Sequence, residues 1–131
     1  KNLKNIYFID REIHSNDVMD KIDMVATISG TVGVEALLKS KKCLVFGNAW
    51  YKSCHGVLKI TDSTSNEEIS NFINIKFDKS KFLNNFKSLV SSCDDGVVDY
   101  DFKDLVENFD NKKNCVQVAI NIKNFINENF N

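Results

Sequence analysis

Residues 23–51 read DMVATISGTVGVEALLKSKKCLVFGNAWY, and the rest of the chain is interpreted outward from this stretch. Its first apolar and β-branched run, residues 24–28, is typical of a buried strand. After a break of turn-forming residues, apolar side chains recur at the i, i+3, i+4 spacing of one helical face. A second apolar run, residues 44–46, then ends at a glycine. Strand, helix and strand in this order predict a βαβ unit, which implies a parallel sheet with a right-handed crossover.

Apolar runs on either side of this unit extend the pattern. Residues 6–9 (IYFI) and residues 57–60 predict two further strands, while the chain after residue 61 has mostly helical periodicity. We therefore expect residues 1–131 to form one α/β domain, in which four parallel strands are flanked by helices. Outside the central unit, the expected helices are residues 17–22, 67–73 (capped by a hydroxyl of the preceding loop), 79–91 and 102–130, the last with a break at residues 110–111.

The composition excludes several classes of protein. The formal net charge is −1, so the chain lacks the positive charge with which nucleic-acid-binding proteins neutralise phosphates. No apolar run is long enough to predict a transmembrane helix. The cysteines and histidines match no zinc-binding spacing, so we expect no metal site and reduced thiols, as in the cytoplasm. Because the chain does not begin with methionine, we interpret it as part of a longer protein.

Small polar residues follow both strands of the βαβ unit. Ser29, Gly30 and Thr31 come after the first strand, and Gly47 and Asn48 come after the second. In open parallel sheets, ligands bind outside the carboxyl ends of the strands. A helix that begins directly after a strand offers free backbone N–H groups to a phosphate. The turn therefore predicts a phosphate site, and the alternative is that one of its hydroxyls merely caps the helix.

Glu35 lies one turn into the same expected helix, close to the predicted phosphate site. A carboxylate at this position can accept hydrogen bonds from both ribose hydroxyls of a nucleotide. The alternative is a surface ion pair with Lys39, four residues further along the helix, which would stabilise the helix by only a few tenths of a kcal/mol.

Three segments together resemble a known family. SGTVGVEAL (residues 29–37), KCLVFGNAWY (residues 42–51) and HGV (residues 55–57) resemble the capsule polysaccharide biosynthesis family, and the resemblance covers residues 6–60. Its members are bacterial glycosyltransferases with two Rossmann-like domains, the GT-B architecture. The resemblance implies that this chain is the donor-nucleotide-binding domain, that is, the C-terminal half of such an enzyme.

The family resemblance implies roles for particular residues. Ser29, Gly30 and Thr31 would contact the phosphate of a nucleotide-activated sugar, often CMP-linked Kdo, and Glu35 would contact its ribose. The remaining residues of the expected cleft are Gly47, Asn48 and Tyr51. An N-terminal domain outside this chain would supply the contacts to a glycan or glycolipid acceptor and the catalytic base. The chain alone is therefore expected to be inactive, and the full protein is expected in the cytoplasm, at the inner face of the membrane.

Two segments depart from the family's pattern. Residues 40–43 (SKKC) stand where Gly-Lys-Pro is usual, and residues 54–56 (CHG) replace a Pro-Gly turn. His55 is interpreted either as a proton carrier beside the cleft or as a turn residue that replaces proline. These departures keep two other functions open, a non-catalytic α/β interaction module and a nucleotide-sugar epimerase of the same fold.

Two further signals have plain structural alternatives. Residues 99–101 (DYD) match the D-x-D string with which another glycosyltransferase fold holds a metal, but they also suit a solvated helix start. Trp50 and Tyr51 could stack on a base or sugar, or pack onto the sheet.

Overall fold

A computed structural model describes residues 4–130 of the chain. They divide into two compact units, the first ending at Leu89 and the second beginning at Val90. Each unit is described by itself, and the assignment of residues 1–131 to a single nucleotide-binding domain stays a prediction.

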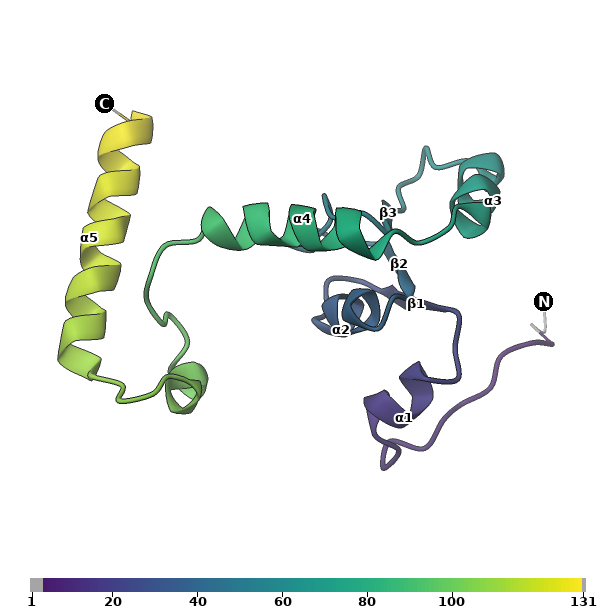
Figure 1. Ribbon diagram of the computed structural model, residues 1–131, viewed down its shortest axis with the longest axis horizontal. Coiled ribbons are helices and arrows are strands. Elements are labelled where there is room, and N and C mark those ends of the chain that lie inside the picture. The colour runs from purple at the N-terminus through teal and green to yellow at the C-terminus, as the bar shows by residue number, and fades with distance from the viewer. Residues whose placement is uncertain (1–3, 131) are drawn as a thin grey trace. The chain divides into compact units, whose positions relative to one another are not determined.

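The first unit is built on a three-stranded parallel sheet (Figure 1). Its strands β1 (Met24–Thr27), β2 (Lys42–Val45) and β3 (Val57–Lys59) lie in the order β1-β2-β3, and both neighbouring pairs are parallel. The helix α2 (Val32–Leu38) connects β1 to β2 and packs on both strands. The βαβ unit and the α/β fold with a parallel sheet flanked by helices are therefore confirmed.

Three further helices complete this part of the chain, and each overlaps a predicted helix. They are α1 (Ser15–Met19), α3 (Asn66–Asn74) and α4 (Lys79–Ser91), although α1 begins and ends before the predicted residues 17–22. The predicted hydroxyl cap of α3 is present as a capping box. The backbone N–H of Glu68 donates to Ser65 Oγ at 3.1 Å, while the Ser65 N–H donates to Glu68 Oε2 at 2.7 Å.

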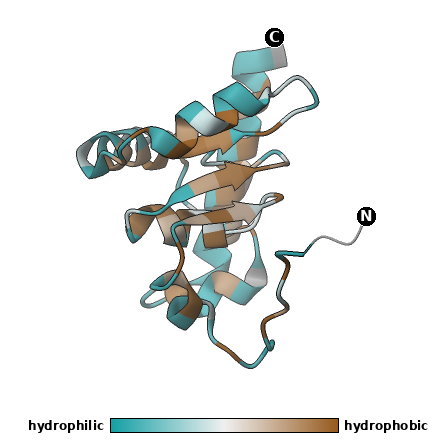
Figure 2. Cartoon of the chain, turned by 90° about the vertical axis from the view of Figure 1, so that its right-hand side faces the viewer, coloured by the Kyte–Doolittle hydropathy of each residue, from teal (hydrophilic) through white to brown (hydrophobic). Residues whose placement is uncertain are grey.

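The hydrophobic core lies between the sheet, α2 and the loop that joins β2 to β3. On the sheet, alternate residues such as Cys43 and Val45 point to the same face and are fully buried. Figure 2 shows these strands as an apolar layer with polar residues outside it. The buried residues of the core are Met19, Val25, Ala36, Leu37, Cys43, Val45, Ala49, Tyr51, Cys54 and Phe82.

The strand predicted at residues 6–9 is wrong. These residues form no strand in the structure, and their side chains are exposed, up to 99% for Phe8. The sheet therefore has three strands where four were expected. The reason is that an apolar run indicates only a preference for burial. It forms a strand only where a neighbouring strand is available for pairing.

The second unit contains a 3₁₀ helix, η1 (Tyr100–Leu105), and the long helix α5 (Asn111–Phe130). The predicted helical stretch with a break near residues 110–111 is confirmed in outline, since the break covers residues 106–110. Asn114 holds the segment before η1, because its side-chain amide exchanges two hydrogen bonds with the backbone of Val97, at 2.7 and 2.8 Å.

Candidate functional site

The two polar segments predicted to form a site lie side by side beyond the carboxyl ends of β1 and β2. The backbone N–H of Phe46 donates to the carbonyl of Thr27 at 3.0 Å, and the N–H of Gly47 donates to the carbonyl of Ile28 at 2.7 Å. The backbones approach so closely that a Cβ on Gly47 would lie 2.8 Å from the Ile28 carbonyl oxygen. Only glycine fits there, so the contact fixes Asn48 next to the turn after β1.

The turn between β1 and α2 is exposed at all three of its residues, Ser29, Gly30 and Thr31. The N–H of Gly30 is bound by Thr27 Oγ1 at 3.1 Å. Thr31 is the N-cap of α2, yet its side chain makes no capping hydrogen bond. Neither hydroxyl of the turn has a partner among the described residues, so the alternative in which one of them caps the helix is not observed.

Tyr51 supports this turn from inside the core. Its side chain is fully buried, and its hydroxyl donates to the Gly30 carbonyl at 2.6 Å. Any Cβ on Gly33 would overlap that hydroxyl, so glycine is required where α2 crosses the ring. Burial, with a smaller contribution from the Cys43 thiol, raises the pKa of Tyr51 to about 12, so the hydroxyl keeps its proton. Tyr51 therefore holds the backbone of the turn in position.

Glu35 has no ion pair with Lys39. The Lys39 ammonium instead lies 2.8 Å from Asp20 Oδ1 and also donates to the carbonyl of Asn16 at 3.3 Å. The hydrogen bond from Lys39 and its charge lower the pKa of Asp20. Glu35 is exposed in the first turn of α2, and its carboxylate has no partner in the part of the chain that the structure describes.

Exposed apolar side chains surround the polar segments; the sequence interpretation considered Trp50 for this role but missed Ile28 and Phe46. Ile28 and Phe46 follow β1 and β2 directly and are 72% and 54% exposed. Trp50 is half exposed and packs edge-on against Tyr51, with its ring centroid 5.4 Å away, and against Phe86 of α4. Ile28 and Phe46 could have been found from the sequence, because each ends an apolar run and lies one residue past the end of its strand. Asn48, on the same edge, accepts a hydrogen bond from Lys52.

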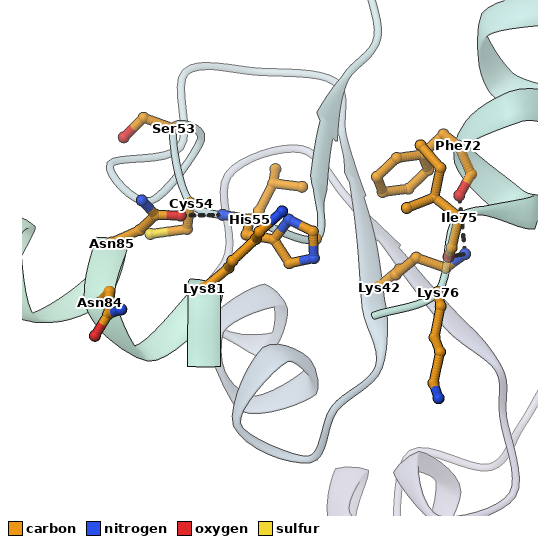
Figure 3. A pocket seen from close by; sticks show the side chains of 12 residues that line it. Lys42, Ser53, Cys54, His55, Phe72, Ile75, Lys76, Lys81, Asn84 and Asn85 are labelled. Atoms are coloured by element: carbon orange, nitrogen blue, oxygen red, sulfur yellow. Dashed lines mark hydrogen bonds between the residues drawn. The ribbon is translucent and has the colours of Figure 1, made fainter. Parts of the chain in front are cut away.

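His55 lies at the opposite edge of the sheet, because it directly precedes β3. A four-residue strand spans roughly 13 Å, so His55 and the turn after β1 lie on different edges. Its Nε2 accepts from the backbone N–H of Asp78 at 3.0 Å, and the backbone N–H of His55 donates to Asn85 Oδ1 at 2.9 Å. These bonds support the interpretation of His55 as a turn residue. It lines a cavity of about 540 Å³ together with Lys42 and Lys81 (Figure 3).

The D-x-D string begins the 3₁₀ helix of the second unit. Asp99 is the N-cap of η1, and its Oδ1 accepts from the N–H of Asp101 at 3.1 Å. The structural alternative for this string is therefore the one observed.

Comparisons with known proteins agree with this part of the structure. A family model described as "Capsule polysaccharide biosynthesis protein" matches residues 1–69, a range that contains the whole sheet, α2 and both polar segments. No curated protein and no solved structure matched the chain. Within residues 4–130, no helix has the length and hydropathy needed to cross a bilayer.

Proposed function

We propose a function from one established fact: the chain belongs to the capsule polysaccharide biosynthesis protein family, whose model matches more than half of it. The chain is the nucleotide-sugar-binding domain of a glycosyltransferase that builds a capsule or another surface polysaccharide. The donor nucleotide binds at the carboxyl edge of the sheet, between the turn after β1 and the segment after β2.

The observation that carries this proposal is the unused hydrogen-bonding capacity at that edge. The hydroxyls of Ser29 and Thr31 have no described partner, and the backbone N–H groups of Thr31 and Val32 donate no hydrogen bond within residues 4–130. Donors that converge on an exposed turn favour an anionic ligand. Because Tyr51 and Gly47 fix the backbone on both sides, the donors are held in place before the ligand arrives.

The phosphate, the ribose and the base of the donor nucleotide each have a matching group in this arrangement. The turn binds the phosphate, and the carboxylate of Glu35 accepts from the ribose hydroxyls. Trp50, Ile28 and Phe46 provide apolar surface on which a nucleobase can lie, which releases water from exposed side chains. Asn48 contributes a side-chain amide from the segment after β2.

The reaction would be a direct displacement at the anomeric carbon of the sugar. Negative charge grows on the leaving phosphate as its bond to the sugar breaks, and the donors of the turn stabilise that charge. The acceptor, a glycan or glycolipid, and the base that takes its proton are assigned to a second domain of the full-length protein. No residue of this chain is assigned as the base.

The proposal is tested by titrating the chain with CMP, UDP and GDP, using calorimetry and backbone chemical shifts. We expect one of them to bind with a dissociation constant of about 1 mM or lower, the affinity of a modest contact set. Glu35→Ala should weaken it about tenfold, because a charged hydrogen bond is lost. Glu67→Ala is the matched control, since Glu67 also lies exposed in the first turn of a helix, α3.

Two results would contradict the proposal. One is equal loss of affinity in Glu35→Ala and Glu67→Ala, which would indicate a general charge effect. The other is the absence of nucleotide binding both by this chain and by the full-length protein, which would favour the non-catalytic module.

A further inference from the structure

A cavity lies at the amino edge of the sheet, away from the proposed donor site. Its walls come from the start of β2, the turn before β3, the end of α3 and the first turns of α4, all within the first unit (Figure 3). Its volume of about 540 Å³ is within the range of small-molecule sites in proteins.

The residues around this cavity are cationic. Three lysines line it, and no carboxylate does. A neighbouring carboxylate, that of Asp78, accepts the backbone N–H of Lys81 at 3.0 Å; this bond lowers the pKa of Asp78, with further contributions from the Ser80 N–H and the charge of Lys81. Three ammonium charges against one carboxylate leave the cavity with an excess of positive charge, which attracts anions.

The Lys42 ammonium is already hydrogen-bonded within the protein. Its ammonium donates to the carbonyls at the end of α3, including those of Phe72 and Ile75, both at 2.8 Å. These bonds satisfy free carbonyl groups of the helix and tie α3 to the start of β2. Lys42 therefore contributes a fixed charge to the cavity wall, and its hydrogen-bonding capacity is used.

The ammonium groups of Lys76 and Lys81 make no hydrogen bond to any residue that the structure describes. Both side chains are exposed. In Figure 3 the Lys81 side chain extends toward His55, whereas the Lys76 side chain extends in another direction, away from His55. Because His55 Nε2 accepts the backbone N–H of Asp78, Nδ1 is the ring nitrogen that can donate to a ligand. The Asn85 amide also keeps its N–H₂ donors, since only its Oδ1 is used.

We propose that this cavity binds the phosphate group of a phosphorylated ligand beside Lys81, His55 and Asn85. The Lys81 ammonium and the neighbouring amide and imidazole N–H groups can donate to the phosphate oxygens, while Lys42 and Lys76 add positive charge to the cavity wall. Phe72 and Ile75 give the rest of the ligand an apolar wall. The site is separate from the proposed donor site and does not depend on it.

The two histidines allow a direct test by nuclear magnetic resonance. His55 lines the cavity, whereas His14 is exposed just before α1 and serves as an internal control. We expect inorganic pyrophosphate and glucose 1-phosphate to shift the imidazole signals of His55 and to leave those of His14 unchanged. The pair Lys76→Ala and Lys81→Ala, combined, should weaken binding about tenfold or more.

A matched double variant separates this site from a general effect of charge. Lys21→Ala with Lys87→Ala removes the same charge from exposed positions that do not line the cavity. Its affinity should equal that of the wild type. Equal loss in the two double variants would overturn the proposal, as would an unchanged His55 signal with every phosphate probe.

The same phosphate chemistry can come from a free metabolite or from a lipid headgroup. Sedimentation with phosphatidylcholine vesicles, with and without phosphatidylglycerol, distinguishes these sources. Binding to the anionic vesicles that is lost in the Lys76/Lys81 variant would assign the site to a headgroup, while binding to the soluble phosphates alone would assign it to a metabolite. A nucleotide that perturbs Ser29 and Glu35 but not His55 would support the donor site while counting against this one.

Discussion

The two units of this chain contain similar helices but differ in what those helices bury. The first unit packs ten buried side chains between its sheet, α1, α2, α4 and the loop after β2. Among the described side chains of the second unit none is buried, although α5 carries a row of apolar residues that includes Ile122 and Ile126. Burial of apolar area drives folding. Stability should therefore reside in the first unit, which is also the part that contains the family match.

The largest difference between the units is expected in the free energy of unfolding that is lost when an apolar side chain is truncated. Phe82 of α4 is fully buried against Phe77 and Phe86, so Phe82→Ala should lower the free energy of unfolding by about 3–5 kcal/mol. Ile122 is 57% exposed, so Ile122→Ala should change it by less than about 1 kcal/mol. Urea unfolding measures both, with the fluorescence of Trp50, the single tryptophan, reporting on the first unit and helical circular dichroism reporting on α5. Comparable losses in the two variants would mean that α5 belongs to a core.

Alkaline pH should destabilise the first unit through the buried thiol of Cys43. Burial raises the pKa of Cys43 from 9.0 to about 11, so the folded state holds this proton more tightly than the unfolded state. The resulting stabilisation is complete below pH 9.0 and is lost as the pH rises through about 11. The Trp50 unfolding transition should therefore weaken over this interval, and Cys43→Ala should flatten the dependence. An equally steep loss in that variant would assign the effect to Tyr51, whose pKa is raised to about 12, or to Cys54, whose pKa is also raised by burial.

The features that could be predicted from sequence are those set by residues close together in the chain. Hydrophobic periodicity gave α4 at Lys79–Ser91 and the βαβ unit, and the placement of polar residues after each strand gave the two adjacent segments at the carboxyl edge. The Ser65 cap of α3 follows from local turn chemistry in the same way.

The features that were missed depend on partners far apart in the chain. Tyr51 donates a hydrogen bond to Gly30, 21 residues earlier. Lys39 pairs with Asp20, 19 residues earlier, and not with its helical neighbour Glu35. The cationic cavity joins Lys42 to residues more than 30 positions later. Local spacing carries no information about such pairs, because they exist only after the sheet and the loops around it have packed.

Removal of a helix cap should also affect the two units differently, with a smaller change in the free energy of unfolding. Ser65→Ala should cost about 1 kcal/mol, because the capping box is lost. The loss should appear in the Trp50 transition, since Lys42 ties the far end of α3 to the sheet. Asp110 caps α5 by accepting the N–H of Lys113 at 3.1 Å. Asp110→Ala should reduce helical circular dichroism while the Trp50 transition stays unchanged, and a shift of that transition would contradict independent unfolding.

The smallest effect is expected where each unit holds a residue at positive φ. Ser40 has φ +61° in the position that ends α2, and the N–H groups of Ser40 and Lys41 bond back to the carbonyls of Leu37 and Ala36, at 3.0 and 2.8 Å. This is a Schellman motif, whose left-handed residue is usually glycine, and the related family has Gly-Lys-Pro near this position.

Ser40→Gly should therefore raise the free energy of unfolding, by roughly 0.5–1 kcal/mol, because glycine adopts positive φ without the steric cost but loses more chain entropy on folding. Asn108, at φ +53° in the second unit, is the matched position. Asparagine tolerates this conformation better than serine does, and its unit has no buried core, so Asn108→Gly should leave the Trp50 transition unchanged. If Ser40→Gly instead lowered stability, a contact of the Ser40 side chain rather than its backbone strain would govern the end of α2. The departure from the family's glycine would then be an adaptation of this chain rather than a cost to it.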